Sequence, residues 1–148
     1  YKGFLDMPIL YLSGYIVKNK EKYYNLIQKI HYHNDWEEWI IYMLDGIEQT
    51  SKNTIIAIKN IRNLMKKTSK TLQEYDTKIY NKDFIEALFI YPYTKIDFIA
   101  EKLNITRQTA SRYLKVCEKL KILRCVKLGR INYYVNIELF KLFKKGIC

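Results

Sequence analysis

Hydroxyl, amide and guanidinium side chains lie close together in the stretch T106-R-Q-T-A-S-R112, and lysines follow at helical spacing. Short or forked donors near the start of a helix can contact the edges of bases, and cations further along can hold phosphates. We expect one group of residues to face base edges and a second to face phosphates. The first group is Thr106, Arg107, Gln108, Thr109 and Arg112, with Ser111 beside it, and the second is Lys115, Lys119, Lys127 and Arg130.

Positive charge is concentrated around these residues. Between Arg107 and Arg130, eight Lys or Arg residues stand against one acid, Glu118, so these 24 residues carry a net charge of +7. The whole chain has a formal net charge of +11, which favours polyanionic partners without naming one. A solvated basic face is the alternative interpretation of such a run, but the predicted elements around it favour contact with nucleic acid.

Two predicted helices and a hairpin would position these side chains. A short amphipathic helix is expected from about Lys95 to Leu103, and a tight break at Asn104-Ile105 leads into a second helix from about Thr106 to Lys121. Two β-rich runs then flank a turn at Gly129; they are 123–127 and 131–135. Helix, turn, helix and hairpin in this order are typical of a winged helix-turn-helix DNA-binding domain.

Polar residues at the predicted helix starts support this arrangement. Thr94 and Thr106 can each accept a hydrogen bond from a free backbone N–H at the start of the helix that follows, and Asn81 can cap a preceding helix from about Lys82 to Ile90. A closing helix is expected over residues 137–145. The buried face of the second helix is predicted to consist of Ala110, Leu114, Cys117 and Leu120.

The N-terminal half reads as helical. A helix is predicted over 22–30, with a loop at 31–34, and a longer one from Asp35 to about Tyr75 that is expected to break near residues 51–53. The polar stretch 66–78 predicts a linker or domain boundary. Coiled-coil dimerisation through residues 54–72 is an alternative. The fold class is therefore mainly α, with a helical bundle fragment over 1–75 and a winged helix-turn-helix domain with a two-stranded β wing over 76–148.

The remaining candidates for chemistry are weak. His31 and His33 have no Cys or acid at ligand spacing, so no metal site is predicted, and no glycine-rich phosphate loop is present. The three cysteines follow no C-x-x-C spacing, which favours reduced thiols in a cytoplasmic protein. No apolar run approaches the ~18–20 residues of a membrane span, so no membrane partner is expected.

Three N-terminal stretches carry a resemblance to a known family: L5-D-M-P-I-L-Y-L-S-G-Y-I16, Y23-Y-N-L-I27 and D35-W-E-E-W-I40. They resemble the C-terminal helices of Fic (filamentation-induced-by-cAMP) adenylyltransferases. Many bacterial members continue into a helical linker and a winged helix similar to three stretches of this chain. These are I79-Y-N-K-D-F-I-E-A-L-F89, Y91-P-Y-T-K-I-D-F98 and G129-R-I-N-Y-Y-V135.

The resemblance implies that a longer parent protein has an enzymatic activity, and that this chain alone would lack that activity. Fic enzymes transfer AMP from ATP, with Mg²⁺, to a hydroxyl of a target protein, and their catalytic motif is H-P-F-x-x-G-N-G-R. That motif does not occur here, and it would lie just upstream of Tyr1. The chain is therefore expected to be a fragment without catalytic residues or a cofactor of its own. By the same resemblance, Tyr23 and His31 would lie against the nucleotide.

Three functional hypotheses follow. The first is a module that binds double-stranded DNA, joined to the C-terminal part of a Fic domain and in contact with the rest of that domain. The second is a winged helix used for protein contact, either regulating the Fic enzyme or pairing subunits in a homodimer. The third is that the chain is itself an active adenylyltransferase. We expect a test with labelled ATP to show no transferred AMP and so to exclude this hypothesis.

Overall fold

The computed structural model describes residues 11–76 and 79–146, with side chains up to residue 144. The structure is mainly helical with a small antiparallel sheet, as predicted. Its contacts divide into two compact units, one reaching to Ile58 and one running from Lys59 to Lys145. The start of the segment that resembles Fic helices, Leu5 to Leu10, lies outside the described residues.

The N-terminal unit contains α1 (Ser13–Lys18), α2 (Lys20–His33) and the first part of α3 (Glu37–Tyr75). Tyr42 is fully buried, and the ring of Tyr15 lies 5.2 Å from its ring, measured between centroids. Tyr15 also fits against Gly46, where an added Cβ would come within 2.7 Å of the Tyr15 ring. The predicted loop at 31–34 is wrong, because α2 continues to His33 and ends at Asn34, whose φ of 54° is left-handed.

Helix α3 is continuous for 39 residues, so the predicted break near residues 51–53 is wrong. The hydroxyls of Ser51 and Thr54 donate to the carbonyl oxygens of Ile47 and Thr50, at 2.7 and 2.8 Å, and so are satisfied within the helix. The helix also runs through most of the predicted linker, where Leu72 is fully buried. Because α3 contributes to both units, the domain boundary at 75/76 stays a prediction.

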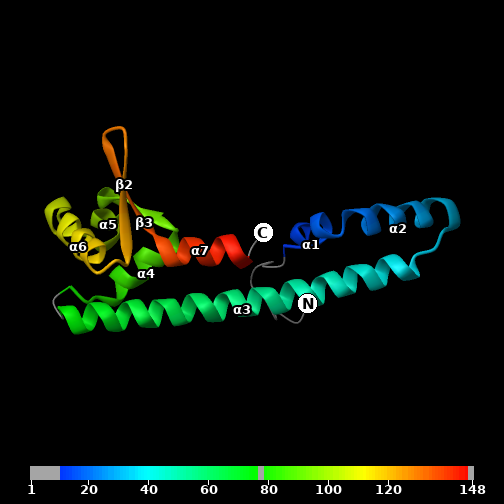
Figure 1. Cartoon of the computed structure of the whole chain (residues 1–148), viewed down its shortest axis with the longest axis horizontal. Coiled ribbons are helices and arrows are strands. Elements are labelled where there is room, and N and C mark those ends of the chain that lie inside the picture. Colours follow the sequence, from blue (N-terminus) through cyan, green and yellow to red (C-terminus); the bar gives the residue numbers. More distant parts are fainter. Residues whose placement is uncertain (1–10, 77–78, 147–148) are drawn as a thin grey trace. The chain divides into compact units, whose positions relative to one another are not determined.

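The C-terminal unit continues from α3 with four helices and three strands, all within the described part of the chain. The helices are α4 (Lys82–Ile90), α5 (Ile96–Leu103), α6 (Arg107–Lys119) and α7 (Ile137–Gly146). The strands are β1 (Tyr93–Thr94), β2 (Leu123–Leu128) and β3 (Ile131–Asn136), in the order β1-β3-β2. Figure 1 shows the β2–β3 hairpin extending away from the helices of this unit.

The β2–β3 hairpin has the two strands predicted for the wing, and the short strand β1 adds a third strand to the same sheet. The carbonyl of Pro92 accepts a hydrogen bond from the Asn136 amide at 2.9 Å, and Thr94 then pairs with Tyr134 of β3. The sheet therefore has three strands. Thr94 was predicted to cap α5, but it lies in this strand, and its buried hydroxyl has no hydrogen-bond partner among the residues that the structure describes. The N-cap of α5 is Lys95, which makes no side-chain capping bond.

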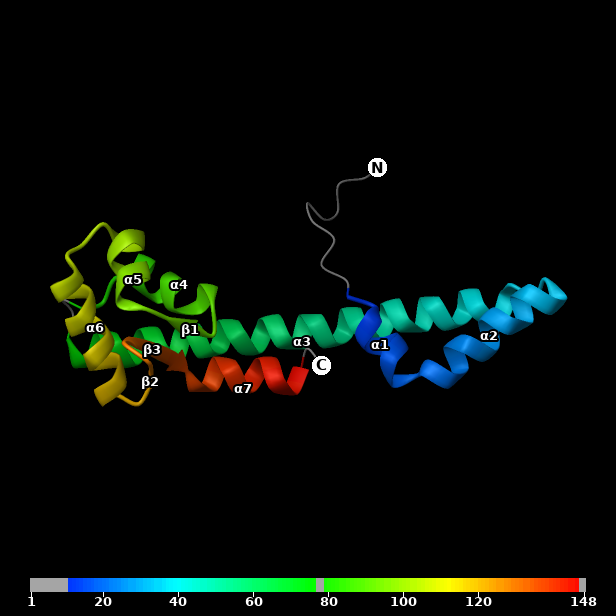
Figure 2. The same cartoon turned by 90° about the horizontal axis from the view of Figure 1, so that it is seen from above.

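The core of the C-terminal unit joins the helices to the sheet. Helices α5 and α6 pack directly against each other (Figure 2). Three of the four residues predicted for the buried face of α6 are confirmed as fully buried, and the fourth, Leu120, is half-buried. Fully buried residues from other elements include Leu72, Phe84, Ile99 and Leu139. Among the helices in the described ranges, none is long and apolar enough to cross a membrane.

Candidate nucleic-acid interface

The turn between α5 and α6 fixes where α6 begins. Asn104 has a φ of 52°, and the amide of Ile105 donates to the carbonyl of Ala100 at 2.9 Å, which closes the end of α5. The hydroxyl of Thr106 accepts a hydrogen bond from the amide of Thr109 at 3.2 Å. Both the tight break and the Thr106 cap are therefore confirmed. They hold the first turn of α6 at a defined angle to α5.

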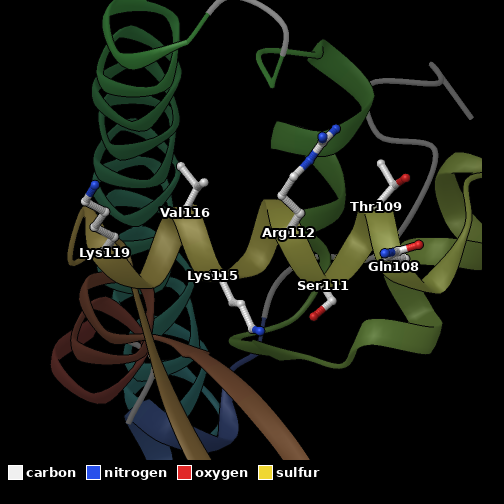
Figure 3. Close-up of a pocket in the computed structure, with 7 residues that line it drawn as sticks. All are labelled: Gln108, Thr109, Ser111, Arg112, Lys115, Val116 and Lys119. Atoms are coloured by element: carbon white, nitrogen blue, oxygen red, sulfur yellow. The ribbon is translucent and has the colours of Figure 1, made fainter.

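The side of α6 that faces away from the core carries the polar residues singled out from the sequence. An open hollow of about 750 Å³ lies along this side. In Figure 3, Ser111 and Lys115 point one way from the helix axis, whereas Thr109, Arg112 and Val116 point the other way. The residues that line the hollow are Gln108, Thr109, Ser111, Arg112, Lys115, Val116 and Lys119. Six of them were predicted as DNA contacts, and all six line this one hollow.

The cations of α6 have different local partners. Arg107 donates from Nη1 to Oδ1 of Asp97, on the first turn of α5, at 2.5 Å. Lys119 lies near Tyr75, and the guanidinium carbon of Arg112 lies 5.7 Å from the centre of the Tyr113 ring. Within the described ranges, no carboxylate forms an ion pair with Arg112, Lys115 or Lys119. Uncompensated positive charge therefore lies beside the hollow.

The two cations predicted for the hairpin lie apart from the hollow. Lys127 is exposed near the end of β2, opposite Asn132, and Arg130 is exposed in the connecting turn. Neither residue is among those that line the hollow on α6. The turn has two residues between the paired Leu128 and Ile131, and Gly129 at its first position has a φ of 61°. Glycine at that position with positive φ is typical of a type II′ hairpin turn.

Sequence reasoning missed two residues that contact the predicted site. Asp97 falls near the start of the helix predicted from about Lys95 to Leu103 and had no predicted role in the site, and Tyr75 was assigned only to the end of a long helix. Asp97 gave no local signal for its contact, because it lies before the basic run from Arg107 to Arg130 and meets Arg107 only when α5 and α6 pack. No local pattern signals Tyr75, because it meets Lys119 only through the tertiary fold.

The two residues predicted to contact a nucleotide both lie on α2. Tyr23 is half-buried, and its ring lies 6.1 Å from that of Tyr42 and edge-on to that of Tyr24. His31 is exposed at the last turn, with its ring against Tyr32. Neither arrangement tests nucleotide contact, which stays a prediction. Among the described residues, no group of three or more His, Cys, Asp or Glu side chains could hold a metal ion.

A family model described as the C-terminal domain of SoFic-like protein adenylyltransferases matches residues 64–139, just over half of the chain. The chain belongs to this family. The sequence-based resemblance to the C-terminal part of a Fic protein is thus confirmed. The SoFic-like match begins inside α3 and ends inside α7. It contains all ten predicted DNA-contacting residues, whereas Tyr23 and His31 lie outside it.

Proposed function

We propose that the SoFic-like C-terminal domain is a winged helix-turn-helix module that binds double-stranded DNA. Helices α5 and α6, with the tight turn at Asn104, supply the helix-turn-helix, and the β2–β3 hairpin supplies the wing. In helix-turn-helix proteins the second helix enters the major groove and its first residues reach the base edges. Here that helix is α6, and its first residues are Arg107, Gln108 and Thr109.

One observation carries the proposal. The exposed side of α6 holds cations that no carboxylate neutralises within the described ranges, Arg112 and Lys115 foremost, beside an open hollow. Surface cations without acidic partners keep their full attraction for a polyanion. Polar side chains suited to base edges, among them Gln108 and Thr109, line the same hollow. Arg112, Gln108 and Arg107 are exposed rather than packed against neighbouring helices, as groove contact requires.

The proposal gives a role to each of the six cations predicted to contact DNA. Arg107 and Arg112 would contact base edges, and Lys115, Lys119, Lys127 and Arg130 would contact phosphates. Four phosphate contacts would give a slope of about −3.6 in a plot of log binding constant against log salt concentration. Affinity would therefore fall steeply between low and physiological salt.

The test is a titration of a labelled duplex by fluorescence anisotropy across a series of salt concentrations. Arg112→Ala should cost about 1–3 kcal/mol of binding free energy at a preferred site, and Lys115→Ala should make the salt slope shallower by about 1. Lys52→Ala is the matched control, because Lys52 is an exposed lysine of α3 that lies outside this surface. Thermal melting of each variant verifies that its fold is intact.

If Arg112→Ala and Lys115→Ala bind the duplex as tightly as Lys52→Ala does, with the same salt slope, α6 is not the groove-binding helix. A wild-type chain without duplex affinity at ~100 mM salt would remove the DNA proposal altogether.

A second candidate function is protein contact through the wing. Leu128 and Ile131, at the end of the hairpin, are 61% and 47% exposed. Exposed apolar side chains at the end of a hairpin are suited to contact with another protein surface, either a second copy or the Fic domain that the module would regulate. This function predicts a mass that rises with protein concentration in sedimentation, and its loss in Leu128→Glu.

We assign AMP transfer to a whole Fic protein, acting in the cytoplasm with ATP and Mg²⁺, rather than to these 148 residues. The reason is that H-P-F-x-x-G-N-G-R does not occur in the sequence. Incubation with labelled ATP and a panel of proteins should leave no labelled AMP on any of them. Transfer by the chain alone would contradict this assignment.

A further inference from the structure

The ion pair between Asp97 and Arg107 joins the first turn of α5 to the first turn of α6. Both side chains are largely exposed, at 62% and 74%. Among the cations of α6 in the described structure, Arg107 is the one paired with a carboxylate. The pair thus holds a single positive group at the point where α6 would first meet a duplex, and leaves Arg112 and Lys115 unpaired.

A carboxylate at this position affects phosphates and base edges differently. A phosphate oxygen carries negative charge and would have to displace Asp97 from Arg107 while being repelled by it. A base edge offers neutral acceptors, and a guanidinium has five N–H donors, so Arg107 can keep one on Asp97 and direct others at a base. Exposed ion pairs are weak, so the pair restrains Arg107 without locking it in place.

We propose that Asp97 is a selectivity residue of the DNA-binding surface. It holds Arg107 at the start of α6 and opposes phosphate there, so that Arg107 adds less to sequence-independent binding than its charge allows. This inference rests on the proposed binding of DNA by α6. Asp97 acts through Arg107 and is a positioning residue.

The test uses the full chain and a labelled duplex of random sequence, across a series of salt concentrations. Asp97→Asn frees Arg107 for phosphate, whereas Glu101→Gln removes the same charge one turn later on α5, from a residue with no ion pair in the described structure. Asp97→Asn should bind at least about threefold more tightly than Glu101→Gln at equal salt, and its salt slope should be steeper by about 0.9, as for one added phosphate contact.

A double-mutant cycle separates the pair from a general charge effect. In an Arg107→Gln background, Asp97→Asn should lose its advantage over Glu101→Gln, because the cation that it releases is gone. The inference is overturned if Asp97→Asn and Glu101→Gln bind alike, or if the advantage persists without Arg107. These outcomes leave DNA binding by the wild-type chain in place. If none of the variants, the wild type included, binds the duplex, the proposed function itself fails and this inference with it.

Discussion

The ammonium group of Lys119 lies 3.3 Å from the hydroxyl of Tyr75 and 5.6 Å from the centre of its ring. These residues are 44 positions apart in the chain, and they join the last turn of α6 to the last turn of α3. The contact therefore joins the far end of the candidate DNA-binding helix to the part of α3 that belongs to the same unit. The same contact engages Lys119, which is one of the cations proposed to contact phosphate.

Substitutions at Tyr75 should separate the two parts of this contact. Tyr75→Phe keeps the ring beneath the ammonium and should change the free energy of unfolding by less than about 0.5 kcal/mol, since an exposed hydrogen bond contributes little. Tyr75→Ala removes the ring as well and should cost about 1 kcal/mol. Urea unfolding followed by circular dichroism measures both. Equal losses in the two variants would mean that the hydroxyl, and not the ring, holds Lys119.

The cap of α6 gives a second prediction. Thr106→Ala should lower the free energy of unfolding by about 1 kcal/mol, because the amide of Thr109 loses its acceptor at the helix start. Thr106→Ser keeps a hydroxyl at the same position and is the matched control. A Thr106→Ala protein as stable as the Thr106→Ser protein would show that water replaces the cap without loss.

The end of α3 should behave as part of the C-terminal core. Leu72 is fully buried among residues of this unit, so Leu72→Ala should cost about 2–5 kcal/mol. Ile56→Ala, at a site on the same helix that is 56% exposed, should change stability by no more than about 0.5 kcal/mol. Chemical unfolding of the two variants is the measurement. A small effect at Leu72 would support the linker that the sequence predicted there.

Cys117 predicts a loss of stability in alkali. Burial raises the pKa of its thiol from 9.0 to about 12. Below pH 9 the thiol is protonated in both the folded and the unfolded chain, so the full contribution is present. Between pH 9 and 12 the unfolded chain loses a proton that the folded chain keeps, and stability falls, by about 2 kcal/mol between about pH 8 and pH 10.5.

The measurement for Cys117 is urea unfolding at these two pH values, with Cys117→Ala as the reference. The alanine variant lacks this thiol but keeps the other two cysteines and the tyrosines, so the difference between the two proteins isolates Cys117 from those groups. Parallel pH dependence in the two proteins would contradict the prediction. In the wild type, iodoacetamide at pH 8 should also leave Cys117 unmodified until the chain unfolds.

Local sequence signals predicted α4 and α6 well, because the boundaries of these two helices have local causes. The side chain of Asn81 caps α4 through the amide of Asp83, at 2.8 Å, and Thr106 caps α6, both as expected. The apolar spacing along α6 predicted its buried face. Each of these features depends on residues within a few positions of one another.

What the sequence did not predict depends on distant partners. Strand β1 forms because two residues after Pro92 pair with β3, about forty positions later, and this pairing moved Thr94 out of its expected capping role. The same holds within the candidate site. Asp97 meets Arg107, and Tyr75 meets Lys119, only after α3, α5 and α6 have packed together.

The two-residue loop at Gly129-Arg130 joins strands whose side chains alternate between the faces of the sheet. Adding one residue to each strand would carry Arg130 to the opposite side, whereas adding two would restore its side and move it about 7 Å further out. Variation in the length of this hairpin therefore obeys a parity rule. In a homologue whose strands are longer by an even number of residues, the outermost cation would keep its side and could contact a DNA phosphate further from α6. In a homologue whose strands are longer by an odd number, that cation would lie on the opposite face of the hairpin.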